Sequence, residues 1–549
     1  MLAQPKFLPT TRQEMQSLGW DELDILLVSG DAYVDHPSFG VAILGRWLVH
    51  HGYRVGIIAQ PRWTDTQDIS RLGRPRLFAG VTAGALDSML AHYTAFRKKR
   101  SDDAYTPGGQ AGARPNRACL VYSSLIKQAF PGLPIVLGGI EASLRRISHY
   151  DFWTDKIRRS ILIDAKADLL LYGMAERGIV EAARALETNT DCDVTPISGS
   201  VSIQNQKSKI ANALTLPSHE EILADPRKLM EATLQIEQHV HHANQTAIQP
   251  VENRFLILTP PHPLNQSEMD VLYSLPFTRE PHPSYKQPIP AADMIRFSIT
   301  AHRGCAGGCS FCALAAHQGR GIRSRSESSI LSEARTMTSH AKWTGSITDV
   351  GGPSANMWGG YCADDPTRCQ RASCLYPNVC PHFVVDQMKM VSLLRQLKQL
   401  PRVKHVRIAS GIRHDLALKD REYIRALVRE FVGGQLKIAP EHLSDQVLRL
   451  MRKPGQQTFE QFLEIFEQEC KAAGKEQYII PYLITAVPGC TDRDMRFLSD
   501  WLSRRHWRPQ QIQCFIPLPG TVAAAMYHAG VDTHGKPISI PKSDAARLK

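Results

Sequence analysis

The stretch Arg303-Gly-Cys-Ala-Gly-Gly-Cys-Ser-Phe-Cys-Ala-Leu314 places three cysteines close together in the chain. Their C-x3-C-x2-C spacing lets one short loop turn three thiolates toward a single centre. The glycines between them favour such a loop, because a backbone that wraps a cluster needs the positive φ angles that glycine adopts readily. Three thiolates leave one iron of a [4Fe–4S] cluster without a protein ligand, whereas electron-transfer clusters normally have four. We therefore expect Cys305, Cys309 and Cys312 to bind a cluster with one open iron.

This spacing resembles the signature of the radical S-adenosylmethionine (SAM) enzymes, and Phe311 stands where that superfamily typically has an aromatic residue. The resemblance implies that the open iron chelates the amino and carboxylate groups of SAM. It also implies that an electron from the cluster cleaves SAM to a 5′-deoxyadenosyl radical. A zinc loop is the plain alternative, but zinc sites usually come as paired C-x2-C or Cys/His units.

Length and composition are those of a multidomain globular protein. A chain of 549 residues is too long for one hydrophobic core, and its hydrophobic content of 43% is ordinary. No run of about 20 apolar residues could span a bilayer, and the N-terminus lacks the apolar segment of a secretion signal. We expect a cytoplasmic protein with no membrane partner, whose 12 cysteines are metal ligands or thiols rather than disulfides.

The net charge of +12 permits a nucleic-acid partner but does not indicate one. Basic residues are spread along the chain, with only short groups such as Arg97-Lys-Lys-Arg100. A dispersed positive charge serves solubility, which is the simpler interpretation.

Residues 1–203 have the pattern of a Rossmann-like domain. Apolar runs typical of buried parallel strands cover Asp24–Ser29, Tyr53–Ala59, Leu133–Glu141 and Ala167–Gly173, and Pro37 to His51 predicts a helix between the first two. Strand, helix and strand at this spacing predict a parallel pair. The carboxyl ends of such strands form ligand crevices in open α/β sheets.

A Rossmann-like domain ahead of a radical SAM core is similar to the cobalamin-binding domains of some superfamily members. In those domains an Asp-x-His-x-x-Gly pattern supplies the lower cobalt ligand. Here Asp35-His-Pro-Ser-Phe-Gly40 has these residues at another spacing. The sequence therefore makes cobalamin an unfavoured cofactor.

The remaining chain predicts a connector at residues 204–290, with a helix near Pro226 to Asn244, and then a barrel at 291–530 and a loose polar tail at 531–549. Met294–Thr300 predicts the first barrel strand, so the cysteine loop follows its carboxyl end, where a β/α barrel places its chemistry. Five more strands are predicted at Gly345–Val350, Val403–Ala409, Gly434–Ala439, Tyr478–Ile484 and Gln511–Ile516. Six strands separated by helices fit the partial (β/α)6 barrel that radical SAM enzymes share, so the fold class is α/β in both parts.

Candidate cofactor-binding residues follow two of these strands. Gly351 and Gly352 end the second, where the superfamily commonly has Gly-Gly-Glu and uses its backbone to hold the SAM amino group; the acidic residue is absent here. A tight turn is the alternative role for the glycines. Ser410 and Arg413 end the third strand, where an arginine can hold a carboxylate bidentately or form only an ion pair.

Glu441 and His442 close the fourth strand and should face the same mouth of the barrel. Either could exchange protons or bind substrate, and with Arg413 they are our candidates for catalytic residues. A lone histidine is also a common structural hydrogen-bonding group.

A second group of cysteines lies in an insertion at about 358–382. Cys362, Cys369, Cys374 and Cys380 are separated by six, four and five residues, in sequence rich in Pro, Asp and Asn. They could bind an auxiliary iron–sulfur cluster or a structural zinc, since either needs a folded loop that gathers thiolates. The spacing does not select the metal, and free thiols are the alternative.

Several longer phrases resemble the YgiQ family of radical SAM proteins over nearly the whole chain. They are Asp31–Gly40, Gly138–Arg146, His149-Tyr150, Arg303–Cys312, Arg323–Ser326, Asp349–Met357, Ser410–Arg413, Ala439–His442 and Met526-Tyr527. The resemblance implies a [4Fe–4S] cluster with SAM as cofactor or cosubstrate, but it implies no particular reaction. Two departures, Val487-Pro-Gly for His-Pro-Gly and Gln513-Cys-Phe for Gln-Asp-Phe, leave the roles of the replaced residues in doubt.

The favoured hypothesis is an enzyme that cleaves SAM with an electron from an external donor and abstracts hydrogen from an unknown substrate. Polar residues of the N-terminal domain would help to bind that substrate: Asp31, Asp35, His36 and Glu141. A methylthiotransferase-like modification of RNA or protein is a narrower alternative, although the extra cysteines of such enzymes precede the radical site. A non-catalytic iron–sulfur protein that senses redox state or binds nucleic acid is the third.

Overall fold

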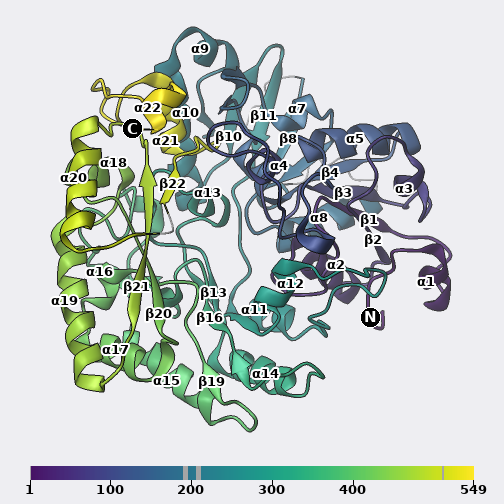
Figure 1. The fold of residues 1–549 in the computed structure, drawn as a ribbon. Helices are drawn as coiled ribbons and strands as arrows, with labels where there is room; N and C mark the ends of the chain where they lie inside the picture. The colour runs from purple at the N-terminus through teal and green to yellow at the C-terminus, as the bar shows by residue number, and fades with distance from the viewer. Residues whose placement is uncertain (1, 189–195, 206–211, 510–511, 549) are drawn as a thin grey trace. The chain divides into compact units, whose positions relative to one another are not determined.

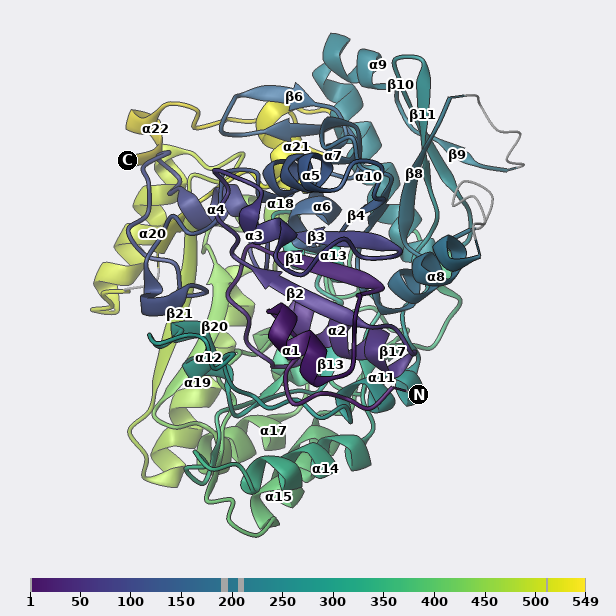
Figure 2. The ribbon, with the colours of Figure 1, turned by 90° about the vertical axis from the view of Figure 1, so that its right-hand side faces the viewer.

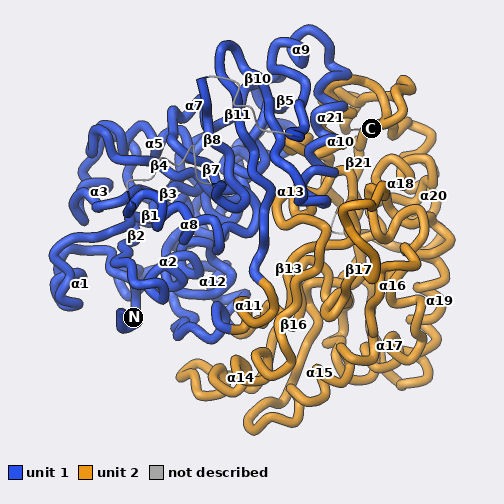
Figure 3. The backbone as a smooth tube through the Cα atoms, turned by 180° about the vertical axis from the view of Figure 1, so that it is seen from behind, with its two compact units in different colours: residues 1–264, 271–296 blue, residues 265–270, 297–549 orange. Residues whose placement is uncertain are grey.

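The computed structural model describes residues 2–188, 196–205, 212–509 and 512–548. It divides into two compact units, shown in different colours in Figure 3. Unit 1 contains Met1–Leu264 and Val271–Arg296, and unit 2 contains Asn265–Asp270 and Phe297–Lys549. The described strands of unit 1 form a nine-stranded and a two-stranded sheet, and those of unit 2 form one three-stranded and four two-stranded sheets.

Among the described residues, unit 1 is built on a nine-stranded sheet with the order β2-β1-β3-β4-β7-β8-β11-β10-β9. The first five strands in this order are parallel, and Figure 2 shows β2, β1, β3 and β4 one after another. These strands are β1 (Ile25–Ser29), β2 (Val55–Ala59), β3 (Phe78–Thr82), β4 (Ile135–Leu137) and β7 (Leu169–Leu171). Because β1 and β2 pair in parallel with a helix between them, the predicted parallel pair is confirmed.

Helices cover both faces of this parallel half. α2 (Gly40–His50) packs against α8 (Glu176–Glu187), and α3 (Gln67–Ser70) packs against α5 (Ala118–Ala129). The five strands are almost wholly buried, which explains their near-continuous apolar sequences. The arrangement is the Rossmann-like α/β domain expected for the first part of the chain.

The stretch 204–290 does more than connect two domains. It completes or supplies four strands of the same sheet, β8 (Ser200–Gln204), β9 (Leu214–Thr215), β10 (Ala247–Val251) and β11 (Arg254–Leu258). The expected helix is present as α10 (Pro226–His242). Three of these pairings are antiparallel, so antiparallel strands extend the parallel core of unit 1, and β9 then pairs parallel to β10 at the edge.

Unit 2 contains the predicted barrel strands in parallel pairs that follow chain order. β12 (Ser298–Thr300) pairs with β16 (Asp349–Gly351), and β15 (Ser346–Ile347) pairs with β19 (His405–Val406). An isolated parallel bridge joins Ile412 to Ile438. β20 (Gln435–Glu441), β21 (Tyr478–Thr485) and β22 (Ile512–Cys514) complete the series. The α/β partial barrel is therefore confirmed; residue 511, predicted to begin the last strand, lies outside the described residues.

Helices lie along the outside of these strands, and Figure 1 shows α19 and α20 beside β20 and β21. They are α14 (Glu327–Thr338), α15 (Gln387–Gln399), α17 (Arg421–Ala426), α18 (Asp445–Met451), α19 (Gln456–Ala473) and α20 (Asp492–Arg504). Their apolar faces meet the strands in one large core, with Phe462 and Leu394 fully buried. This core fixes the strand ends, from which the site is built.

The tail after residue 530 is more ordered than the sequence suggests. Val531 forms an antiparallel bridge to Pro537, and the Gly489 N–H donates to the Ser539 carbonyl at 2.7 Å. Arg547 is buried and donates to the Phe515 carbonyl. The polar sequence of 531–548 is thus tied to unit 2 by backbone and side-chain hydrogen bonds.

Candidate functional site

The three cysteines of the opening stretch line one cavity of about 520 Å³ in unit 2. Their loop follows β13 (His302–Arg303), just beyond the carboxyl end of β12. The other walls come from the segments that end β16, β20, β21 and the third strand of the barrel. The predicted position of the loop at the mouth of the barrel is therefore where the structure places it.

Hydrogen bonds from α18 hold this loop in place. The Ser310 hydroxyl donates to the Leu450 carbonyl at 2.7 Å, and the Ser310 N–H donates to the Met451 carbonyl at 3.1 Å. Arg452, which ends the helix in the left-handed region, donates to the Gly308 carbonyl at 3.3 Å. Because the last carbonyls of a helix have no partner within it, the loop satisfies them and gains a rigid support.

The three thiols influence one another electrostatically. Burial raises the pKa of Cys312 to about 12, and negative charge on Cys309 and Cys305 acts in the same direction. Burial also raises the pKa of Cys305, and negative charge on Cys309 adds to this rise. Among the described residues, however, no three His, Cys, Asp or Glu side chains already stand in the geometry of a finished metal site. The fit of a cluster is therefore judged from the donor chemistry and the backbone.

Gly307 gives the clearest sign that the loop can enclose a cluster. A Cβ atom at this position would lie 3.4 Å from Cys305 Sγ, 3.6 Å from Cys309 Sγ and 3.3 Å from Arg413 Nη1. The missing side chain thus leaves space beside two of the three sulfurs. Together with Cys312, which lines the same cavity, these sulfur donors suit the iron of a [4Fe–4S] cluster.

Arg413 faces the sulfurs with one nitrogen only. Its Nη1 atom lies 3.7 Å from Cys309 Sγ, while Nε and Nη2 donate to the Asp415 carboxylate at 2.9 and 2.6 Å. Both side chains are buried. A ligand carboxylate would therefore meet Nη1 rather than the two-nitrogen edge considered from the sequence, because Asp415 already occupies that edge.

Two polar side chains from the Asp349–Met357 phrase fix the turn that carries Arg413. Asn356 Oδ1 accepts from the Arg413 N–H at 2.8 Å, and Asn356 Nδ2 donates to the Arg413 carbonyl at 2.9 Å. Asp349 accepts from the N–H groups of Ala409 and Ser410 at 2.7 and 3.0 Å. Ser410 and Arg413 both line the cavity, and this phrase of the sequence holds them there.

Gly351 and Gly352 stand just behind the wall, which Pro353 and Ser354 line instead. A Cβ at Gly352 would approach the His302 carbonyl to 2.5 Å and its ring to 2.7 Å, and a Cβ at Gly351 would approach Ser410 Oγ to 2.7 Å. Close packing thus requires both glycines, whatever their contact with SAM. Neither ring nitrogen of the buried His302 has a hydrogen-bond partner among the described residues, and burial lowers its pKa to about 4.

Glu441 and His442 are separated by the structure. Glu441 lines the cavity with a left-handed backbone (φ 70°) and lies 3.6 Å from Lys453 Nζ. Burial raises the pKa of Glu441, and Lys453 opposes that rise. His442 is not part of the lining: its Nδ1 accepts from the Ser444 N–H at 2.9 Å, and Nε2 lies 3.8 Å from Cys490 Sγ. The geometry supports Glu441 as a site residue and gives His442 a structural position.

Other lining residues were not singled out from the sequence: His414, Lys437, Lys453, Tyr482 and Gln513. Lys437 and Tyr482 lie on neighbouring parallel strands, whereas Lys453 follows α18. No local motif marks them, because they meet only when the barrel closes. Only Gln513 had a signal in the sequence, because it precedes the cysteine that replaces the aspartate of the family's Gln-Asp-Phe pattern.

The second cysteine group also gathers in unit 2. Burial raises the pKa of the Cys374 thiol to about 11; Arg320 opposes this, while negative charge on Cys369, Cys380 and Cys362 adds to it. As in the first loop, no three of these side chains already stand in the geometry of a finished metal site within the described part of the chain. Of the cysteines outside the two groups, Cys192 lies beyond the described residues.

The four polar residues expected to bind substrate in the N-terminal domain are engaged inside unit 1. Asp35 pairs with the buried Arg46, and His36 Nε2 lies 3.0 Å from Arg279 Nη1. Asp31 accepts from the Ala85 N–H at 2.6 Å, and burial raises its pKa to about 6 although Arg114, 2.9 Å away, opposes the rise. Glu141 Oε2 accepts from the Ser88 N–H at 2.9 Å and from its hydroxyl.

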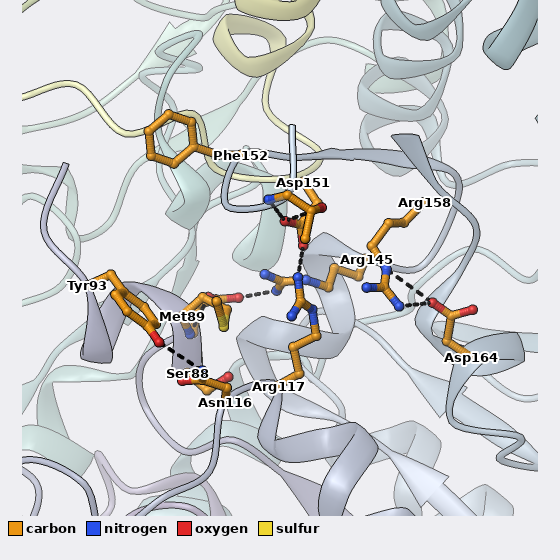
Figure 4. A network of polar contacts seen from close by, with 12 residues as sticks. Ser88, Met89, Tyr93, Asn116, Arg117, Arg145, Asp151, Phe152, Arg158 and Asp164 are labelled. Atoms are coloured by element: carbon orange, nitrogen blue, oxygen red, sulfur yellow. Dashed lines mark hydrogen bonds and ion pairs between the residues drawn. The ribbon is translucent and has the colours of Figure 1, made fainter. Parts of the chain in front are cut away.

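The phrase Gly138–Arg146 continues into an interior network of ion pairs (Figure 4). Arg145 donates to Asp87, and Arg117 pairs with Asp151 at 2.9 Å. Figure 4 shows Arg117 and Arg145 side by side next to Asp151, with the Arg158–Asp164 pair beyond them. Within the described residues, Nε and Nη2 of the buried Arg145 have no hydrogen-bond acceptor. This phrase therefore builds the interior of unit 1.

Two family models match this sequence in adjacent segments. Residues 7–298 match "Radical SAM N-terminal" and residues 299–502 match "Radical SAM superfamily". A UPF0313 protein of Geobacter sulfurreducens is 50% identical over 548 residues, which cover 98% of this chain and 90% of that protein. The chain belongs to the UPF0313 (YgiQ) family of radical SAM proteins. A UPF0313 protein of Thermotoga maritima is 49% identical over 555 residues, 99% of this chain and 97% of that one.

Two solved structures share the fold of this UPF0313 protein at low identity. The radical SAM methyltransferase TsrM of Kitasatospora setae, with cobalamin and a [4Fe–4S] cluster bound, has a TM-score of 0.52 and 13% identity over 90% of this chain and 76% of that one. The cobalamin-dependent radical SAM enzyme OxsB has a TM-score of 0.50 and 12% identity, over 96% of this chain and 58% of that one. The radical SAM domain itself implies a [4Fe–4S] cluster and SAM. In the part of the chain that the structure describes, no helix is long and apolar enough to cross a bilayer.

Proposed function

We propose that this UPF0313 protein is a radical SAM enzyme whose active site is the cavity in unit 2. The observation that carries the proposal is that three thiols from one loop and the Arg413 guanidinium open into a single cavity of about 520 Å³. A volume of this size is in the usual range for small-molecule sites. Cys305, Cys309 and Cys312 would hold a [4Fe–4S] cluster, which supplies the electron that cleaves SAM reductively to the 5′-deoxyadenosyl radical.

Charged side chains of the chain itself suit SAM as the ligand. Lys437 and Lys453 join Arg413 in giving the lining positive charge for the SAM carboxylate. Glu441 is a carboxylate in the same lining, and its negative charge favours the sulfonium. We assign Glu441 the role of charge partner, and of proton acceptor if the reaction releases a proton.

Apolar side chains shield the reacting atoms. Phe311, Leu314, Ile412, Ile438 and Leu483 contribute to the same lining. Such a wall keeps water and oxygen from a carbon-centred radical, which is the part of radical catalysis that a protein supplies. A hydrogen atom taken from an unreactive C–H bond of the substrate is the expected reaction, with the electron delivered by an external donor.

We infer that unit 1 does not bind cobalamin, in contrast to the proteins of similar fold. An open α/β sheet with the order β2-β1-β3 has its crevice at the carboxyl ends of β1 and β3. There Arg114 is buried between Asp31 and Asp103, at 2.9 and 2.8 Å. A Cβ at Gly84 would lie 2.1 Å from Asp31 Oδ1, so the segments are in tight contact. After incubation with hydroxocobalamin and gel filtration, the protein fraction should show no cobalamin absorption in its visible spectrum.

The experiment that tests the enzyme proposal compares wild type with the Cys305→Ala/Cys309→Ala/Cys312→Ala variant after anaerobic reconstitution. Wild type should bind SAM and form 5′-deoxyadenosine with a strong reductant, and the variant should do neither. Cys470→Ser/Cys514→Ser is the matched control, because both cysteines are in unit 2 and outside the cavity lining. Failure of the reconstituted wild type to bind SAM would refute the proposal.

A further inference from the structure

The segment 361–384 forms a closed loop although it has almost no regular structure. β17 (Tyr361–Cys362) pairs with β18 (Phe383–Val384), which joins the two ends. Arg371 lies inside and donates to the carbonyls of Ser373 and Tyr376 at 3.0 Å each, and also to that of Asn378. One side chain thus holds the middle of the loop.

Backbone hydrogen bonds bring three of its four cysteines into succession. Cys362 stands opposite Phe383 in the β17–β18 pair. The Phe383 N–H donates to the Cys380 carbonyl at 3.0 Å, and the Cys380 N–H donates to the Cys374 carbonyl at 2.7 Å. Cys369 is the fourth; it follows the short 3-10 helix Pro366–Arg368 of the same loop, and its N–H donates to the Pro366 carbonyl at 3.1 Å. The fold therefore brings the backbones of cysteines that lie up to eighteen positions apart into one small loop, although no three of the described thiols already stand in the geometry of a finished metal site.

Packing alone gives this loop little to hold it together. Leu375 and Phe383 are its buried contributions to a small apolar cluster with Ala306, Met357 and Leu416. Three partly buried side chains of the loop pack against that cluster: Cys374, Val379 and Cys380. The rest is polar and rich in turns. Loops of more than about 15 residues with little regular structure of their own are uncommon in compact domains and are usually functional or disordered. Four thiolates without carboxylates or imidazoles are the donor set of zinc and of iron–sulfur clusters.

We propose that Cys362, Cys369, Cys374 and Cys380 form a second, thiolate-only metal centre that holds one Zn²⁺ or one iron–sulfur cluster. Binding exchanges the four thiol protons for the metal, so the loop releases protons as it loads. All four cysteines are ligands, which leaves no open coordination position and makes the centre structural. The centre is distinct from the SAM cavity, whose lining contains none of these four residues.

The position of the loop gives the centre a purpose. The Ser373 hydroxyl donates to the Gly307 carbonyl at 2.6 Å, and the Cys374 N–H donates to the Ala306 carbonyl at 3.0 Å. A Cβ at Gly308 would lie 2.4 Å from the Ala372 carbonyl oxygen, so the two backbones are in direct contact. A metal that rigidifies residues 372–374 therefore also supports the loop that carries Cys305 and Cys309.

The test uses the full chain with Cys305, Cys309 and Cys312 replaced by alanine, which removes the first cluster. This variant is loaded separately with Zn²⁺ and with iron and sulfide, then gel-filtered and analysed for zinc, iron and acid-labile sulfide. We expect one equivalent of Zn²⁺ or one cluster to remain bound; the element retained identifies the metal. Co²⁺ should give the intense charge-transfer absorption of thiolate ligation. Because the first cluster is absent, the outcome is independent of the proposed SAM chemistry.

Two further changes in this background complete the test. Cys374→Ser/Cys380→Ser should lower metal retention at least tenfold, whereas the matched Cys470→Ser/Cys514→Ser should not. If the Cys374→Ser/Cys380→Ser variant misfolds, Cys362→Ser replaces it in the test. Cys362 is exposed, so its substitution removes a ligand with little loss of packing. Circular dichroism verifies folding. The proposal would be overturned if no metal stayed bound after either loading, or if Cys374→Ser/Cys380→Ser retained as much metal as its parent. A disulfide among these four cysteines in protein isolated under reducing conditions would also overturn it.

Discussion

The Nη1 atom of Arg413 lies 3.7 Å from the Sγ atom of Cys309, while the other two guanidinium nitrogens are bound to Asp415. Asp415 therefore aims a fixed positive charge at a sulfur of the predicted cluster loop. A guanidinium is always charged and holds a planar carboxylate partner rigidly. The pair gives the cavity a permanent cation that does not depend on a bound ligand.

Asp415→Asn should destabilise unit 2 by about 3 kcal/mol, because it leaves the buried Arg413 without its counter-charge. Burial opposes ionisation of Asp415, but Arg413 outweighs it and lowers the carboxyl pKa to about 2. A depressed carboxyl pKa contributes stability above its unfolded value and loses it as the pH falls through the folded value. The difference in melting temperature between wild type and variant should thus be constant from about pH 6 to about pH 8 and shrink below about pH 4. A difference that changes between pH 6 and 8 would contradict this assignment.

Gly307→Ala should lower the iron content of reconstituted protein severalfold without lowering the stability of the metal-free protein. The added methyl group would meet the two sulfurs and Arg413 Nη1 at 3.3 to 3.6 Å, which the metal-free chain tolerates with small shifts but a bound cluster does not. Gly321→Ala is the matched control, because no atom lies within 4 Å of a Cβ there. Iron analysis and thermal melts measure the two effects. If both variants bound the same amount of iron, the space beside the sulfurs at Gly307 would no longer be evidence for a cluster.

Asn356→Ala should weaken SAM binding about tenfold, which corresponds to about 1.4 kcal/mol. The change deletes both hydrogen bonds to the Arg413 backbone and leaves the buried Arg413 N–H unpaired, whereas the Arg413 carbonyl keeps its bond from the Ala417 N–H. Anaerobic calorimetry gives the affinity, and iron analysis of the same samples is the internal control, since the Asn356 side chain hydrogen-bonds to Ser354 and to the Arg413 backbone. Loss of iron together with affinity would mean that Asn356 supports the whole loop rather than Arg413.

Glu441→Gln should weaken SAM binding about tenfold near neutral pH, because it removes the carboxylate that attracts the sulfonium. Burial raises the pKa of Glu441 above its ordinary 4.5. The affinity of wild type for SAM should therefore increase as the pH rises through this raised pKa, and the variant should lack the increase. Glu464→Gln, an exposed carboxylate of α19, is the control. The same pH dependence in wild type and Glu441→Gln would exclude Glu441 as the charge partner.

The fold could be predicted where burial leaves a local signal. β1, β2, β4 and β7 are apolar along their length because both faces are covered, and the sequence located all four. β3 was missed, because Gly80 interrupts it at the point where the Leu27 side chain occupies the space of a Cβ. The antiparallel strands of 204–290 were also missed. β10 contains Pro250 and the buried polar Gln249, which is satisfied by Ser148 and Pro217.

The candidate site shows the same division. The cysteine loop is local in the sequence, so its spacing was sufficient to place it at the mouth of the barrel. Lys453 and Tyr482 reach the cavity from separate elements, and only the closed barrel reveals them. The adjacent Glu441 and His442 could not be distinguished by sequence, since the left-handed backbone at Glu441 turns one toward the cavity and the other toward Cys490.

The most direct test of the central claim is the electron paramagnetic resonance spectrum of the reduced, reconstituted protein with and without SAM labelled with ¹⁷O in its carboxylate. It requires neither the unknown substrate nor turnover. If Cys305, Cys309 and Cys312 hold a cluster with one open iron, SAM should change the spectrum and the label should give a resolved or broadened ¹⁷O hyperfine interaction. A [4Fe–4S] signal that is identical with and without SAM would contradict the assignment of this cavity as a radical SAM active site.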